Sequence, residues 1–210
     1  FEVRHLANDG DVFAPGSGPG EIGMLATMGF LMSAGLARLA GRLGSRVYDA
    51  AAMVLTVLGV IFAGFGLLVF ENPLLGGRSV GDGVIFNALL VGYLVPAAAA
   101  ALAARLSTAG RPRWFATMLS GVALALAFAY VTLMVRKAYH GPVLWRGPET
   151  DPELWTYSAV WMAFGVVLLL AGIRIASQPA RLASAAIIVL TVVKVFLIDM
   201  SALTGIWRAL

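Results

Sequence analysis

Lys194 is the residue that most directly suggests chemistry, because it interrupts the apolar stretch 182–200. A charge at the centre of a membrane span costs about 2.5–3.5 kcal/mol, so it normally has a structural or functional reason. Lys194 is therefore interpreted as an anchor that reaches the membrane surface, or as a ligand or ion site. Asp199 follows five residues later, about 140° around an α-helix. We therefore expect the partner of Lys194 on another helix or in an anionic headgroup.

Basic and aromatic side chains gather in the segment 136–155, which is the second candidate. Its members are Arg136, Lys137, Tyr139, His140, Trp145, Arg146 and Trp155. Guanidinium groups suit phosphate and carboxylate, and aromatic faces suit sugar rings or headgroups. The segment is interpreted as a site for an anionic lipid or envelope saccharide, or as an aromatic belt at the membrane interface. Glu149, Asp151 and Glu153 share the segment and could pair with its bases.

The remaining reactive residue types form no catalytic or metal-binding pattern. The chain has no cysteine, which excludes disulfides, thiolate zinc sites and cysteine nucleophiles. Its two histidines, His5 and His140, have no nearby ligands at metal-binding spacing. The glycine-rich segments 15–23 and 76–83 lack the Lys-Ser/Thr ending of a phosphate-binding loop. We expect no metal, no cofactor and no catalytic residue, and we lean towards a protein that is not an enzyme.

Helices that cross a membrane must position these candidates. The 210 residues are 60% hydrophobic and 12% charged, with a mean hydropathy of +0.88, whereas a soluble domain is about 25% charged. A helix of about 20 apolar residues spans a bilayer. Such stretches lie at 22–37, 50–70, 83–104, 114–135, 154–173 and 182–200. The sequence predicts an all-α, polytopic transmembrane helical bundle with six spans.

The distribution of charge predicts how these spans are oriented. The loops after spans one, three and five carry arginines, namely Arg38, Arg42, Arg46, Arg105, Arg111, Arg113, Arg174 and Arg181. Short basic loops remain cytoplasmic, so the long loops 1–21 and 136–153 are expected to be extracytoplasmic. The net charge of +4 then reflects membrane topology, and nucleic acid is not expected as a partner.

An internal repeat organises the chain. Residues 54–57 and 189–192 both read Val-Leu-Thr-Val, a shift of 135 positions at which Gly59 corresponds to Lys194. One unit would hold four spans, so successive units keep one orientation and the internal repeats are parallel. The chain is expected to begin with an extracytoplasmic segment at 1–21, followed by the helical hairpin of the first repeat at 22–75 and by helices three and four at 83–135. An extracytoplasmic loop is expected at 136–153. The helical hairpin of the second repeat and the start of the next helix are expected at 154–210.

The C-terminal part of the chain carries a family resemblance. The stretches Trp-Thr-Tyr-Ser-Ala-Val-Trp at 155–161 and Leu-Thr-Val-Val-Lys-Val-Phe-Leu-Ile-Asp at 190–199 resemble a bacterial family of predicted membrane proteins, domain of unknown function 2339. The resemblance is strongest over about 135–210, implies many membrane helices and no reaction, and adds Tyr157 to the candidates. Members of the family are very long. Since this chain begins at Phe1 and ends inside an apolar segment, we expect a fragment of a longer chain in the bacterial inner (cytoplasmic) membrane.

Three functions remain open at this point. The first is a non-enzymatic scaffold or accessory component in cell-envelope assembly, with the lipid bilayer and other membrane proteins as partners. The second is a transporter or flippase for an anionic lipid or saccharide, and the third is a membrane transferase with its chemistry outside this chain. A polar cavity that reaches Lys194 would favour transport. The ligand or headgroup candidates are Lys194, Asp199, Arg136, His140, Arg146 and Tyr157.

Overall fold

Every regular element among the described residues is a helix in the computed structural model of the chain. The structure describes residues 3, 5, 18–107, 111 and 113–200. Most of the expected segment 1–21, and the expected start of a further helix after residue 200, lie outside the described residues. The elements are α2 (Pro19–Leu43), α3 (Arg46–Ile61), η1 (Phe62–Phe70), η2 (Leu90–Leu94), α4 (Val95–Leu106), α5 (Arg113–His140), α6 (Asp151–Arg174), α7 (Gln178–Lys194) and η3 (Val195–Asp199).

These helices belong to two compact units. The first unit comprises Phe1–Leu133 and Gly141–Arg146, and the second comprises Met134–His140 and Gly147–Leu210. Five helices in the described part of the chain are long and apolar enough to cross a membrane, namely Pro19–Leu43, Arg46–Phe70, Trp114–His140, Asp151–Arg174 and Gln178–Asp199. The all-helical bundle is confirmed, with a sixth and shorter apolar helix at Leu90–Leu106.

The sixth helix begins later than the expected stretch 83–104 because Asn87 starts it. The Oδ1 of Asn87 accepts the N–H of Leu90 at 3.0 Å, which is the contact of an N-terminal cap. The Asn87 amide donates in turn to the carbonyl of Gly83 at 3.1 Å. The apolar residues between Gly83 and Asn87 therefore lie outside the helix, and the helix is too short to count among the five candidate spans.

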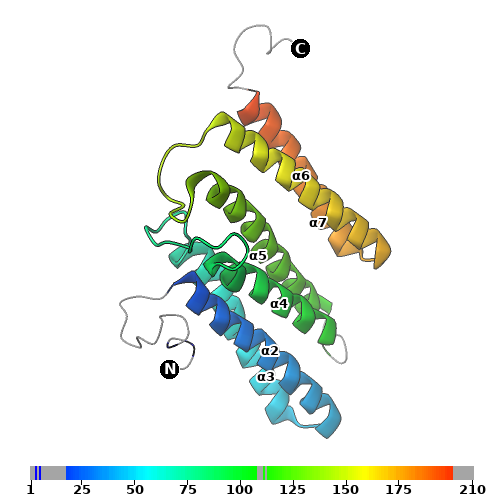
Figure 1. The fold of residues 1–210 in the computed structure, drawn as a ribbon. Coiled ribbons are helices and arrows are strands. Elements are labelled where there is room, and N and C mark those ends of the chain that lie inside the picture. Colours follow the sequence, from blue (N-terminus) through cyan, green and yellow to red (C-terminus); the bar gives the residue numbers. More distant parts are fainter. Residues whose placement is uncertain (1–2, 4, 6–17, 108–110, 112, 201–210) are drawn as a thin grey trace. The chain divides into compact units, whose positions relative to one another are not determined.

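The first unit is built on the hairpin of α2 and α3, coloured blue to cyan in Figure 1, with η2 and α4 packed against α2. Gly44 closes the hairpin turn with a φ of 64°, a left-handed conformation that glycine adopts without strain. Close glycine contacts join the helices. A Cβ on Gly23 would lie 2.4 Å from the Cα of Gly92, and one on Gly29 would lie 3.3 Å from the Cα of Gly59. Small residues at helix crossings are typical of packing within membranes.

Interhelical hydrogen bonds satisfy polar groups inside the first unit. Ser33 on α2 donates to the carbonyl of Ala52 on α3 at 2.7 Å. The buried Tyr93 on η2 donates its hydroxyl to the carbonyl of Leu67 on η1, also at 2.7 Å. Because a lipid environment offers no water to such groups, these bonds hold the helices at fixed positions along one another.

The second unit is centred on the hairpin of α6 and α7, coloured yellow to orange in Figure 1. Ser177 caps α7 by accepting the N–H of Ala180 at 3.4 Å. The unit also contains the last turns of α5, which continues to His140. Arg136 and His140 therefore lie on a helix, although the sequence favoured a loop at 136–153.

Candidate functional site

Lys194 is enclosed between α6 and α7. Its Nζ donates to the carbonyl of Leu154 at 2.9 Å, to Oγ of Ser158 at 2.9 Å and to Oδ1 of Asp199 at 2.7 Å. A lysine ammonium has three protons, and these contacts use all of them. The side chain of Lys194 is 9% exposed and that of Asp199 is 7% exposed. The intramembrane charge is thus paired at short range inside one hairpin.

Ser158 closes this group into a ring. Its hydroxyl donates to Oδ2 of Asp199 at 2.6 Å while its oxygen accepts from Lys194. Each of the two carboxylate oxygens of Asp199 therefore has a donor. We call Lys194, Ser158 and Asp199 the hairpin pin, because Ser158 lies on α6 and the two charged residues lie on α7 and η3.

The ion pair between Lys194 and Asp199 contradicts the expectation from α-helical spacing. The two residues are five positions apart, which separates them by about 140° in an α-helix. The chain forms the π-helix η3 between them, and the N–H of Met200 bonds the carbonyl of Val195 at 2.9 Å. A wider π turn brings residues five apart towards one face. The expected partner on another helix is also present, in Ser158 and Leu154.

A second buried cluster surrounds Glu153, whose side chain is fully buried. Nη1 of Arg136 donates to both carboxylate oxygens, at 2.9 and 3.1 Å. Nε2 of His140 lies 2.8 Å from Oε2, and the hydroxyl of Tyr157 donates to Oε1 at 3.1 Å. Nη2 of Arg136 donates to the carbonyl of Gly147 at 2.9 Å. We call Arg136, His140, Glu153 and Tyr157 the carboxylate cluster.

Helical spacing explains how the carboxylate cluster forms. Arg136 and His140 are four residues apart on α5, and Glu153 and Tyr157 are four residues apart on α6, so each pair lies on one helix face. The two faces meet at the start of α6. Hydrogen bonds between charged groups, such as those of Arg136 with Glu153, are stronger than hydrogen bonds between neutral groups. The cluster fixes the end of α5 to the beginning of α6.

A comparison with protein families shows to which family the chain belongs. The family model described as "Predicted membrane protein (DUF2339)" matches residues 1–210, the whole chain. The chain belongs to the DUF2339 family. The match confirms the resemblance and extends it beyond the C-terminal region on which it was strongest. No curated protein and no solved structure matches the chain.

Five of the six candidate residues of this DUF2339 member lie in the second unit, divided between the hairpin pin and the carboxylate cluster. Arg146 lies in the first unit, with its guanidinium carbon 6.0 Å from the ring centroid of Trp145. Sequence reasoning missed the central roles of Glu153 and Ser158. Glu153 was noted as a possible partner of the bases, and its position four residues before Tyr157 was the available signal for the cluster.

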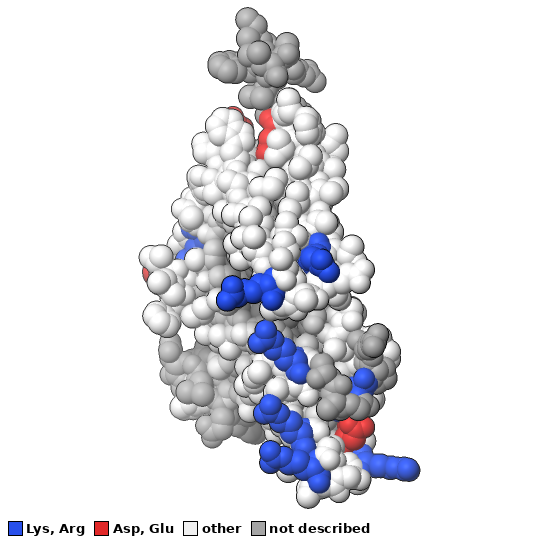
Figure 2. Space-filling view, turned by 90° about the vertical axis from the view of Figure 1, so that its right-hand side faces the viewer, with Lys and Arg blue, Asp and Glu red and all other residues white. Residues whose placement is uncertain are grey.

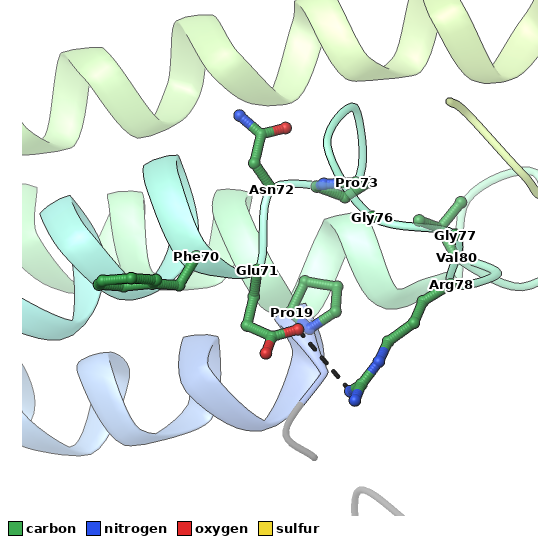
Figure 3. Close-up of a pocket in the computed structure, with 9 residues that line it drawn as sticks. All are labelled: Pro19, Phe70, Glu71, Asn72, Pro73, Gly76, Gly77, Arg78 and Val80. Atoms are coloured by element: carbon green, nitrogen blue, oxygen red, sulfur yellow. Dashed lines mark ion pairs between the residues drawn. The ribbon is translucent and has the colours of Figure 1, made fainter. Parts of the chain in front are cut away.

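Two surface cavities lie in the first unit of this DUF2339 member. One of about 220 Å³ is shown in Figure 3, and it is lined by Pro19, Phe70, Glu71, Asn72, Pro73, Gly76, Gly77, Arg78 and Val80. Arg78 and Glu71 face each other across it, with Nη1 and Oε2 3.7 Å apart. A second cavity of about 340 Å³ shares Pro19 and Arg78 with the first. Neither cavity is lined by a residue of the hairpin pin or of the carboxylate cluster.

Proposed function

We propose that this DUF2339 chain is a non-enzymatic membrane protein that serves as a scaffold or accessory component in assembly of the bacterial cell envelope. The observation that carries the proposal is the hairpin pin. The ammonium group of Lys194 donates three hydrogen bonds, to Leu154, Ser158 and Asp199, at 2.7 to 2.9 Å. A charge used in this way fixes two helices relative to each other, which is the property that a scaffold requires.

The same contacts argue against a transport site at Lys194. A transported anion would have to displace Asp199 from a direct ion pair of 2.7 Å. It would then leave the carboxylate buried and unpaired, which is strongly unfavourable. The carboxylate cluster has the same character, because Glu153 is fully buried and contacts Arg136, His140 and Tyr157 directly. The contacts of both clusters therefore favour a structural role.

Proteoliposomes separate the scaffold from the transporter. We expect vesicles that contain the purified protein to move fluorescent phosphatidylglycerol between leaflets no faster than empty vesicles, as measured by quenching from outside. A photo-crosslinker at the exposed Trp155 is expected to capture one stoichiometric membrane protein in native membranes. Translocation above the empty-vesicle rate that disappears in the variant Lys194→Leu/Asp199→Leu would establish the transporter instead.

The proposal includes a location in the bacterial inner membrane, with the connection between α5 and α6 outside the cytoplasm. Arginines support this orientation, because they gather at the connection of α2 and α3, after α4, and at the connection of α6 and α7. Short basic loops stay on the cytoplasmic side. The acidic residues Glu71, Asp82, Glu149 and Asp151 lie at the opposite ends of these helices or in the connections there.

Single-cysteine labelling tests this orientation cleanly, because the chain has no native cysteine. In intact spheroplasts, a membrane-impermeant maleimide is expected to label Glu149→Cys, in the connection before α6. Ser45→Cys, in the connection of α2 and α3, should react only after the membrane is permeabilised. The reverse pattern would mean that the orientation is the opposite of the one proposed. Labelling of both cysteines from outside would contradict the placement of these two connections on opposite sides of the membrane.

We also propose that the two hairpins are parallel repeats of one design. In each hairpin the second helix passes from α to π geometry, from α3 into η1 and from α7 into η3. Gly59, which corresponds to Lys194 at the shift of 135 positions, contacts Gly29 across the first hairpin. At corresponding positions, two glycines therefore join the helices of the α2–α3 hairpin, and the hairpin pin joins the helices of the α6–α7 hairpin.

A further inference from the structure

Arg111, in the connection between α4 and α5, holds a buried and unsatisfied donor. Its side chain is 8% exposed, and its Nη1 is buried without a hydrogen-bond partner. A buried polar group without a partner costs about 1–3 kcal/mol, and more when the group is charged. In a native protein such a group needs an explanation, such as a ligand. This observation lies in the first unit and is independent of the proposed scaffold function.

The other contacts of Arg111 hold its guanidinium in place. Nη2 donates to Oδ1 of Asp49 on α3 at 2.9 Å, and the guanidinium carbon lies 4.7 Å from the ring centroid of Phe115 on α5. This contact joins one nitrogen of Arg111 to one oxygen of Asp49, although a guanidinium group can bind two acceptor atoms side by side. Asp49 and Phe115 thus fix the plane of the guanidinium, and its Nη1 is the nitrogen that is buried without a hydrogen-bond partner.

The end of the first unit that carries Arg111 is strongly basic. It includes the end of α2, the start of α3 and the end of α4, and Figure 2 shows basic side chains gathered in the lower part of the view with one acidic patch among them. The exposed arginines of these elements are Arg38, Arg42, Arg46 and Arg105. Such a concentration of positive charge attracts anionic lipid headgroups at a membrane surface.

We propose that Nη1 of Arg111 binds a phosphate oxygen of an anionic phospholipid headgroup. Arg111 lies two residues before the start of α5, which is a candidate membrane span, and the end of such a span lies at the level of the headgroups. A guanidinium fork matches the geometry of phosphate oxygens, and it is weakly hydrated compared with an ammonium group. The surrounding arginines select a lipid with net negative charge, and Arg111 supplies the directed contact.

Native mass spectrometry of the purified protein in neutral detergent measures this binding with phosphatidylglycerol as the probe. Arg111→Gln is expected to weaken binding about tenfold, the effect of losing one charge-assisted hydrogen bond. Arg46→Gln is the matched control, because Arg46 is an exposed arginine at the same end, and it should change affinity by about twofold. Arg111→Lys keeps the charge and loses the fork, so it should also weaken binding severalfold.

Four results would overturn the proposal. Equal losses in Arg111→Gln and Arg46→Gln would mean that a diffuse positive field attracts the lipid. Wild-type affinity in Arg111→Lys would mean that the fork is irrelevant. Displacement of the lipid by millimolar inorganic phosphate, or equal affinity for phosphatidylcholine, would mean that the site does not select an anionic phospholipid. Should Arg111→Gln fail to fold, judged by size-exclusion chromatography, the Lys variant decides the question.

Discussion

Replacing Lys194 by leucine is expected to destabilise the hairpin of α6 and α7 by about 3–5 kcal/mol. The substitution leaves Asp199 buried, with Ser158 as its remaining donor across the hairpin. An uncompensated buried charge is far more costly than the loss of an apolar contact. Titration with SDS in mixed micelles, followed by the fluorescence of Trp155 and Trp161 on α6, measures the free energy of unfolding.

The double variant Lys194→Leu/Asp199→Leu is the control for this result. It removes both charges and leaves the hydroxyl of Ser158 within 3.3 Å of the carbonyl of Leu154. Exchange of a whole buried ion pair for apolar residues is often neutral or stabilising. We therefore expect the double variant to regain most of the lost stability. If it is as unstable as Lys194→Leu, the destabilisation comes from packing, and the hairpin pin is not the reason for it.

Glu153→Gln is expected to have an effect of similar size, about 3–5 kcal/mol. Glutamine is close to glutamate in shape, so the change tests charge and hydrogen bonding more than volume. Arg136 would remain buried without the carboxylate of Glu153, and the NH2 of the new amide would face donors of Arg136 or His140. The same SDS titration measures the loss, because Trp155 lies two residues from the substitution.

Glu149→Gln provides the matched comparison. Glu149 lies four residues earlier, in the connection before α6, and is exposed, so the same chemical change should alter the free energy of unfolding by less than about 0.5 kcal/mol. Comparable losses in the two variants would show that the overall charge of the connection matters and that the carboxylate cluster does not. A second substitution, Arg136→Met, should recover part of the stability lost in Glu153→Gln, since it removes a buried cation that has lost its ion pair with Glu153.

The helices of this chain are predictable from composition, and one boundary shows where that prediction ends. Uncharged stretches such as 114–135 and 154–173 lie within α5 and α6, because a lipid-facing helix needs a continuous run of apolar residues. The stretch 83–104 is equally apolar, but only its later part is helical. The difference is the cap at Asn87, a local hydrogen bond that hydropathy does not register.

The candidate residues were recognisable from their type, whereas their partners were not. Lys194 stands out because it is charged within an apolar stretch, yet its pairing with Asp199 depends on a local change from α to π geometry. An ordinary helical wheel separates the two residues. Glu153 lacks any such anomaly in sequence, because acidic residues are common near the start of a helix. Its importance follows from burial, and burial depends on how α5 meets α6.

The hairpin pin also bears on how the protein is made. Lys194 and Asp199 would each be costly to place in the bilayer alone, since a charge at the centre of a span costs about 2.5–3.5 kcal/mol. Ser158 and the carbonyl of Leu154 lie on α6, which is synthesised first. The partners of Lys194 on α6 therefore already exist when the ribosome releases α7. We therefore expect α7 to insert together with α6, because the contacts of Lys194 with α6 lower the cost of placing its charge in the bilayer.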